Sequence, residues 1–123
     1  MKTADFVATL CSGHDNPGKV TVTFTMALNA LQKGHTACVI LMIDAVALGV
    51  PGAADDIDIG QPFEPMAALL KKYLDAGGRI GICRSCLVHN GFSPEQMDSR
   101  FEIITAPDVI DLVMGAKGSL QLA

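Results

Sequence analysis

The sequence has no tryptophan and one tyrosine, and only 18% of its 123 residues are charged. It lacks any cluster of lysine and arginine that could neutralise a row of phosphates, and its formal net charge is −4. Nucleic acid is therefore not an expected partner. The longest apolar candidate, residues 36–43, is far shorter than the ~20 residues that cross a bilayer. The first residues also lack the charged, apolar and small-residue zones of a signal peptide. These absences predict a cytoplasmic protein with no membrane or nucleic-acid partner.

The sequence contains no internal repeat and no low-complexity tract. Half of its residues are hydrophobic, and its length fits one domain of the usual ~100–200 residues, so we expect a single domain over residues 1–123. Its four cysteines do not indicate a disulfide scaffold, because such scaffolds belong to secreted chains that are too small to build a core. Each cysteine must therefore be judged by its neighbours.

Short apolar runs alternate with segments whose apolar residues have helical spacing. The pattern predicts strands at 6–10, 37–43, 79–83, 101–105 and 119–122, and helices at 19–33, 66–74 and 107–114. Residues 48–61 are rich in glycine and aspartate and are expected to form a mobile loop. Strands that alternate with helices imply right-handed crossovers. The fold class is therefore α/β, a three-layer α/β/α sandwich around a mainly parallel sheet.

The helix expected at 19–33 has two apolar rows, and only one of them can face the sheet. We expect the second row to pack against another copy of the chain, which predicts a homo-oligomer. The first row consists of Val20, Phe24, Leu28 and Leu31, and the second of Val22, Met26 and Ala30.

Ligands of parallel sheets collect beyond the carboxyl ends of the strands. In this chain that rule brings together residues 11–19, Asp44 with the loop after it, and residues 83–91. These three segments hold three of the four cysteines and two of the three histidines. We therefore expect the site at this edge.

The most reactive candidate at this edge is the segment Cys83-Arg84-Ser85-Cys86, where a strand ends and a helical turn begins. Free backbone amides there, with positive charge from Arg84 and His89, would favour the thiolate over the thiol. Such a sulfur could accept and pass on a sulfur atom as a persulfide, or exchange disulfides. Cys86 could then resolve a mixed intermediate. The alternative is that both cysteines are small packed residues.

The other cysteines and histidines have weaker signals. Cys11 and His14 follow the first strand; Cys11 is expected to be packed, and His14 either assists proton transfer or is a solvated loop residue. Cys38 lies among apolar neighbours in a strand and is expected in the core. His35 is expected on the surface.

Two segments partly match nucleotide-binding motifs. Residues 13–19 resemble a phosphate-binding loop that starts at Gly13, and residues 39–44 resemble a magnesium-binding strand that ends at Asp44. Val20 stands where the metal-binding hydroxyl should be, so nucleotide hydrolysis is not predicted, although the loop amides could bind an anion.

The cysteines and histidines only partly match the patterns of metal sites and redox motifs. Cys83, Cys86 and His89 have zinc-like spacing, with a fourth ligand from Cys11 or His14, but a lone Cys-x-x-Cys lacks the second ligand pair. A thioredoxin-type role is weak because no tryptophan precedes the pair. We therefore predict no metal and no cofactor.

Several segments resemble the DsrE/DsrF-like sulfur-relay family. The residues that carry the resemblance are Asp44-Ala45-Val46, matching that family's Asp-Gly-Val turn, Cys83 with Cys86 and Asn90-Gly91, matching its Cys-x-x-(Cys or Ala)…Arg-Gly segment, and the junctions Leu74–Gly77 and Ile104–Asp108. Ala45 replaces the usual glycine and Asn90 the usual arginine. The likeness covers almost the whole chain.

The resemblance implies a five-stranded parallel sheet, a trimeric or hexameric assembly, and a loop after the first strand that lies near Cys83. It also implies that Cys83 carries a persulfide, received from a donor protein and passed to an acceptor protein. The rival hypothesis is an oligomeric small-ligand-binding or scaffold module with inert cysteines. The candidate reacting groups are Cys83 and Cys86, and the candidate binding residues around them are Cys11, Gly13, His14, Asp44, Arg84 and His89.

Overall fold

The computed structural model describes residues 1–123 and contains a five-stranded sheet with four α-helices and two short 3-10 helices. The strands lie in the order β4-β3-β2-β1-β5 and all neighbouring pairs are parallel. The predicted fold class, a three-layer sandwich around a parallel five-stranded sheet, is confirmed. In chain order the elements are β1 (Phe6–Leu10), α1 (Pro17–Gln32), β2 (Ala37–Leu41), η1 (Ile43–Gly49), α2 (Met66–Asp75), β3 (Arg79–Cys83), α3 (Arg84–His89), η2 (Pro94–Gln96), β4 (Glu102–Ile104), α4 (Ala106–Gly115) and β5 (Gly118–Leu122).

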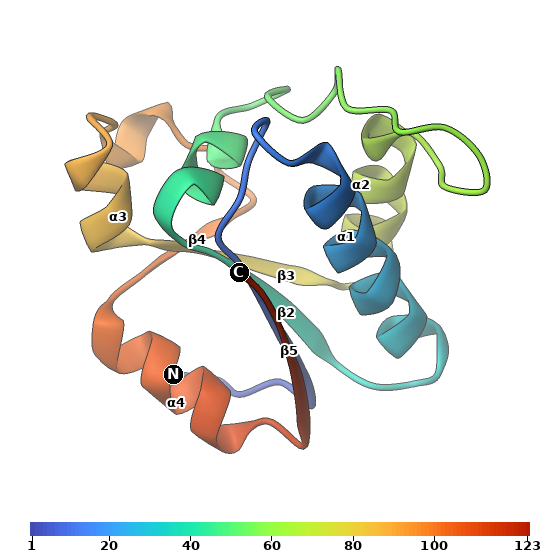
Figure 1. Cartoon of the computed structure of the whole chain (residues 1–123). Helices are drawn as coiled ribbons and strands as arrows, with labels where there is room; N and C mark the ends of the chain where they lie inside the picture. The colour runs from blue at the N-terminus through green and yellow to red at the C-terminus, as the bar shows by residue number, and fades with distance from the viewer.

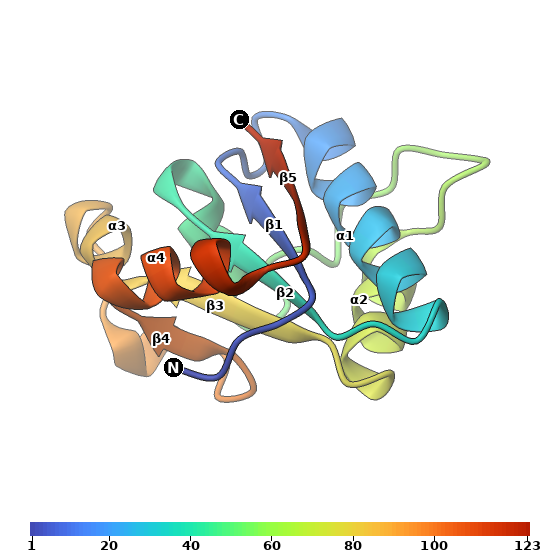
Figure 2. The same ribbon diagram turned by 90° about the horizontal axis from the view of Figure 1, so that it is seen from below.

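Helices cover the two faces of the sheet unequally. Figure 1 shows α1, α2, η1 and α3 on one side and α4 on the other, and Figure 2 shows α4 lying across the sheet from below. The larger side buries a core of 22 residues, and the α4 side buries a core of seven. β2 lies in the middle of the order and is buried at all five positions, as expected for a strand that is covered on both faces.

Helix α1 begins two residues before the predicted start. Asn16 caps it, because its side-chain oxygen accepts a hydrogen bond of 3.1 Å from the Lys19 amide, and Pro17 occupies the first turn. The β-branched threonines, which have low helix propensity, donate their hydroxyl hydrogens to carbonyl oxygens four residues earlier, as in the 2.7 Å bond from Thr23 to Lys19.

Strand β2 is two residues shorter than predicted. It ends at Leu41, and the Met42 amide donates a 2.9 Å hydrogen bond to the Leu10 carbonyl before the backbone turns into η1. The turn occurs at Ile43, which has a positive φ of 53° and so leaves the extended conformation that a strand requires. This 3-10 helix was not predicted from the sequence.

The segment after η1 is attached to the core, which differs from the mobile loop expected at residues 48–61. Ala54 and Ile57 are each 4% exposed and belong to the larger core. The Ile57 carbonyl also accepts a 2.9 Å hydrogen bond from the Met66 amide at the start of α2. Two apolar anchors thus hold a segment whose composition alone suggested a loop.

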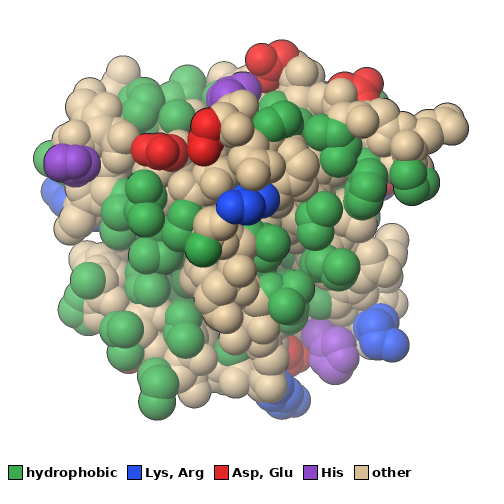
Figure 3. Space-filling view, in the orientation of Figure 1, with side chains coloured by type: hydrophobic (Ala, Val, Ile, Leu, Met, Phe, Trp, Pro, Cys, Tyr) green, Lys and Arg blue, Asp and Glu red, His purple; other side chains and the backbone are tan.

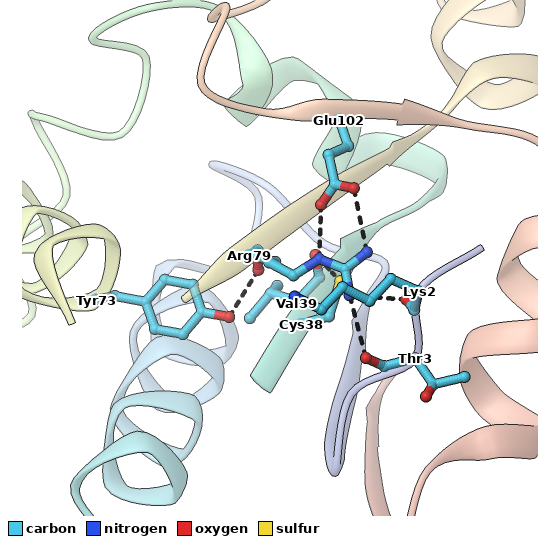
Figure 4. A network of polar contacts seen from close by, with 7 residues as sticks. All are labelled: Lys2, Thr3, Cys38, Val39, Tyr73, Arg79 and Glu102. Atoms are coloured by element: carbon cyan, nitrogen blue, oxygen red, sulfur yellow. Dashed lines mark hydrogen bonds and ion pairs between the residues drawn. The ribbon is translucent and has the colours of Figure 1, made fainter. Parts of the chain in front are cut away.

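A polar network joins the strands at the edge opposite the site (Figure 4). The Arg79 guanidinium donates hydrogen bonds to both carboxylate oxygens of Glu102, at 2.9 and 3.1 Å, and to the Lys2 carbonyl at 2.8 Å. It therefore ties β3 to β4 and to the segment before β1. Cys38 is 1% exposed beside this network, and burial raises the pKa of its thiol to about 11. The expectation that Cys38 is a core residue is confirmed.

None of the helices is long and apolar enough to cross a lipid bilayer.

Candidate functional site

The carboxyl ends of β1, β2 and β3 bring three parts of the chain together. Leu10 pairs with Leu41, and Leu41 pairs with Ile82, so the residues that follow these strands leave the sheet side by side. They are Cys11 after β1, η1 after β2, and Cys83 at the last position of β3. The topology thus supplies the strand edge at which the sequence placed the site.

Cys83 and Cys86 lie on the first turn of α3. Cys83 is the N-cap residue and is only 6% exposed, whereas Cys86 is half-buried. Cys83 and Cys11 both lie close enough to Cys86 to affect the pKa of its thiol. The four cysteines of the chain are all free thiols. The site therefore contains the neighbouring thiols of Cys83 and Cys86, with Cys11 beside them. Of Cys83 and Cys86, Cys86 is the more exposed.

The surroundings of Cys86 disfavour its thiolate. Burial raises the pKa of this thiol above its ordinary value of 9.0, and the neighbouring Cys83 and Cys11 raise it further. A backbone hydrogen bond from Ile43 acts in the opposite direction. The expectation that this turn would favour a thiolate is therefore wrong for Cys86, because desolvation outweighs the single backbone donor.

Cys86 borders an open pocket of about 380 Å³ between η1 and α3. The pocket contains the predicted Asp44 and His89, whereas the buried Cys83 does not line it. Asn90 spans its floor, because its side-chain amide donates to the Cys86 carbonyl at 2.7 Å and to the Ile43 carbonyl at 3.4 Å. The complete lining is Ile43, Asp44, Ser85, Cys86, His89 and Asn90.

Ile43 and Ser85 were not among the predicted site residues. Ser85 could have been predicted from the sequence, because it lies between Cys83 and Cys86. Ile43 carried no signal, because an isoleucine at the end of an apolar run looks like one more strand residue. In the structure it has the left-handed backbone conformation, its side chain is 51% exposed, and its backbone groups face Cys86 and Asn90. A β-branched residue in that conformation is strained.

Ile43→Gly is expected to be more stable than Ile43→Ala by about 1 kcal/mol, because an L-residue in the left-handed conformation costs ~1–2 kcal/mol. At an ordinary position the order is reversed, since glycine is then less stable than alanine by ~0.5–1 kcal/mol. Both variants lose the same exposed side chain, so their comparison isolates the backbone. Urea unfolding of the two proteins measures the difference, and a more stable alanine variant would contradict the assignment of strain.

The loop after β1 separates Cys11 from the other predicted residues of that loop. His14 does not line the thiol pocket. Its Nε2 lies 3.0 Å from the Asp56 carboxylate, and it lines a different pocket of about 330 Å³. The Gly13 amide donates to Asp15 at 2.8 Å. Lys19 contacts the Ala123 carbonyl. The donors that an anion would need in this loop are thus partly occupied by groups of the chain itself.

Gly13 has a structural role at the site. A Cβ at this position would lie 3.0 Å from the Asp44 carbonyl oxygen, which is closer than nearly all real Cβ contacts. The backbone of the β1 loop therefore packs directly on η1, and the absence of a side chain at Gly13 lets Asp44 reach its place in the pocket.

Arg84 is exposed and forms neither a hydrogen bond nor an ion pair. It directly follows Cys83, so it supplies a cationic group on the outside of α3. His35, expected on the surface, is exposed, and its Nδ1 is 3.8 Å from Asp5 at the far end of the sheet. No group of three or more histidine, cysteine or acidic side chains has a geometry that could hold a metal ion.

Comparisons with known proteins agree with the architecture. The ychN protein of E. coli, known from a crystal structure, superposes with a TM-score of 0.75 over 98% of this chain and 99% of that protein, at 16% sequence identity. The uncharacterized protein MJ0760 of Methanocaldococcus jannaschii is 27% identical over 100 residues, which are 81% of this chain. This chain spans only 36% of the length of that relative.

A family model identifies the chain more specifically. The model of the DsrE/DsrF-like family matches residues 5–117, a range that includes every strand but the last and all the thiols of the edge. The resemblance found in the residues around Asp44, Cys83 and Asn90 is thereby confirmed. The chain belongs to the DsrE/DsrF-like family.

Proposed function

We propose that this protein is a small sulfur-relay protein of the cytoplasm that carries sulfane sulfur as a persulfide on Cys83. The observation that carries the proposal is the meeting of Cys11, Cys83 and Cys86 at the carboxyl edge of the sheet, beside a pocket that Cys86 lines. Membership of the DsrE/DsrF-like family supports a sulfur-related role. A reducing compartment suits four free thiols.

The burial of Cys83 suits a carrier more than a catalyst that turns over freely. Its side chain is 6% exposed, so a sulfur atom bound to it is shielded from water and from small oxidants. The open pocket beside Cys86 and His89 supplies the place at which the thiol of a donor or acceptor protein can approach. In this reading Cys83 is the nucleophile that attacks the outer sulfur of a donor persulfide, and the donor thiolate leaves.

Persulfide transfer is tested by incubating the protein with glutathione persulfide and weighing it after removal of the excess reagent. The protein is expected to gain one sulfur atom, located by peptide mapping on Cys83. Cys83→Ser is expected to lose this gain. Cys38→Ser is the matched control, because Cys38 is a buried thiol at the other end of the sheet and its loss leaves the site intact. A protein that gains no sulfur, or a Cys83→Ser variant that gains as much, would overturn the proposal.

The second candidate is an oligomeric ligand-binding or scaffold module with inert thiols. The raised pKa of Cys86, which disfavours its thiolate, favours this second candidate. In that case the same mass measurement shows no added sulfur on either cysteine, and the pocket binds a small ligand without covalent change.

We also propose that the protein assembles as a homotrimer or homohexamer, and that its other partners are the sulfur donor and acceptor proteins. Apolar side chains lie on both sides of the β5 edge, over α1 and α4 (Figure 3). Met26 on α1 is 45% exposed, Leu120 on β5 is 40% exposed, and Met114 on α4 is 79% exposed. β5 has an unpaired outer edge, which favours association. Light scattering at several concentrations measures the assembly, and a monomer throughout would exclude it.

A further inference from the structure

The paired thiols at the start of α3 offer a route by which the bound sulfur can leave. Cys83 and Cys86 are three residues apart, at the N-cap and in the first turn of the helix, and Cys83 lies close enough to Cys86 to raise the pKa of its thiol. Cys83 has the extended backbone of an N-cap, and Cys86 is the third residue of the helix, so both thiols lie at the same end of α3. A Cys83–Cys86 disulfide forms when the first turn brings their Cβ atoms to about 3.5–4.5 Å.

From this geometry we infer that Cys86 discharges the persulfide on Cys83 and releases hydrogen sulfide. The inference rests on the proposed persulfide carrier. The sulfur of Cys86 loses its proton and attacks Sγ of Cys83 in the Cys83–S–SH group. The bond between Sγ and the outer sulfur breaks, the outer sulfur leaves with the electron pair and is protonated, and a Cys83–Cys86 disulfide remains. The persulfide itself is the oxidant, so one persulfide and one thiol give one disulfide and one hydrogen sulfide.

The position of Cys86 at the pocket supports its role as the thiol that attacks the persulfide. Cys86 lines the open volume between η1 and α3, so the leaving sulfide has a path to solvent. The buried Cys83 has no such opening of its own. His89 lines the same pocket one turn further along α3 and can take up or return the proton that moves in the step. The disulfide must afterwards be reduced, so the reaction that follows in sequence is one that supplies a thiol reductant.

The alternative partner for Cys83 is Cys11, which approaches from the loop after β1. Its charge acts on Cys86, but only Cys83 shares the start of α3 with Cys86. If Cys86 is the attacking thiol, Cys86→Ser preserves the persulfide on Cys83. If Cys11 is the attacking thiol, Cys11→Ser preserves it. Cys11→Ser therefore serves as the matched control for Cys86→Ser.

The test follows the fate of the persulfide sulfur after a single loading of four proteins. Each is loaded with glutathione persulfide, freed of reagent, and assayed over time for intact mass and for released sulfide. The original protein and Cys11→Ser are expected to lose the added sulfur, release about one sulfide per chain, and end two hydrogens lighter than the reduced form. Cys86→Ser is expected to keep its sulfur at least tenfold longer and to release no sulfide. Cys83→Ser is expected to give neither product.

Equal lifetimes of the persulfide in the original protein and in Cys86→Ser would overturn the discharge step while leaving the carrier function in place. A longer lifetime in Cys11→Ser alone would also overturn it. If Cys86→Ser fails to load, Cys86→Ala is measured under the same conditions. Failure of the original protein and both Cys86 variants to gain sulfur would instead reject the carrier function, so the two failures are distinguishable.

Discussion

Tyr73→Ala is expected to lower the free energy of unfolding by about 3–5 kcal/mol, the range for removing a large aromatic ring from a core. Tyr73 is the one tyrosine of the chain and is fully buried. Its ring meets Phe24 edge to face at a centroid distance of 5.5 Å, and its hydroxyl donates a 2.7 Å hydrogen bond to the Arg79 carbonyl. The residue thus joins α2, α1 and the first residue of β3. Urea unfolding measures the loss, which is a large share of a typical stability of about 5–15 kcal/mol.

Two companion variants separate the contributions of Tyr73. Tyr73→Phe keeps the ring and removes only the hydrogen bond, so it is expected to cost about 1 kcal/mol. Gly78→Ala tests the packing from the other side, because a Cβ at Gly78 would lie 2.4–2.6 Å from three atoms of the ring. It is expected to cost about 1–3 kcal/mol in the original protein and far less in the Tyr73→Ala background. Additive losses in the double variant would contradict this contact.

Alkylation of Cys86 by iodoacetamide is expected to be slow at neutral pH and to rise about tenfold per pH unit, or about a hundredfold from pH 7 to pH 9. The reason is that the thiolate reacts, and burial with the neighbouring thiols raises the pKa of Cys86 above 9.0. The groups that face this sulfur are the thiols of Cys83 and Cys11, the backbone of Ile43, and the pocket residues Asp44 and His89. Peptide mapping at each pH follows Cys86 alone.

The matched variant for this profile is Cys83→Ala. It removes a neighbouring thiol that raises the pKa of Cys86, so the alkylation profile is expected to move to lower pH. Since a raised pKa means that the neutral thiol predominates below it, alkylation of the original protein should not level off before pH 9. A plateau at or below pH 8 would show that the environment of Cys86 favours the thiolate instead.

Local patterns in the sequence predicted most of the elements because each element carries its own signal. The run that ends at Leu10 and the run from Arg79 to Cys83 form strands with the predicted bounds. The errors occur where distant contacts decide the conformation. Ile43 turns the chain out of β2 instead of extending it, and Ala54 with Ile57 attaches the following segment to the core.

The candidate site also combines features that the sequence predicted with features that depend on distant contacts. The rule for parallel strands placed Cys11, Asp44 and Cys83 at one edge, and the resemblance to the DsrE/DsrF-like family pointed to Cys83. Neither could indicate that His14 pairs with Asp56, which is 42 residues away in the chain. Neither could show that Cys86 lines the pocket while Cys83 is buried and does not line it, because exposure depends on how η1 and α3 pack.

The order of apolar runs and helical spacings, read without coordinates, determined the α/β class, the parallel sheet and the edge that holds the thiols. These properties follow from short-range periodicity, which every segment carries in its own residues. Only the tertiary structure decided which thiol is exposed to solvent, which is buried, and that the pKa of Cys86 is raised. Those properties depend on burial and on neighbours brought close by folding, and no single segment of the chain contains that information.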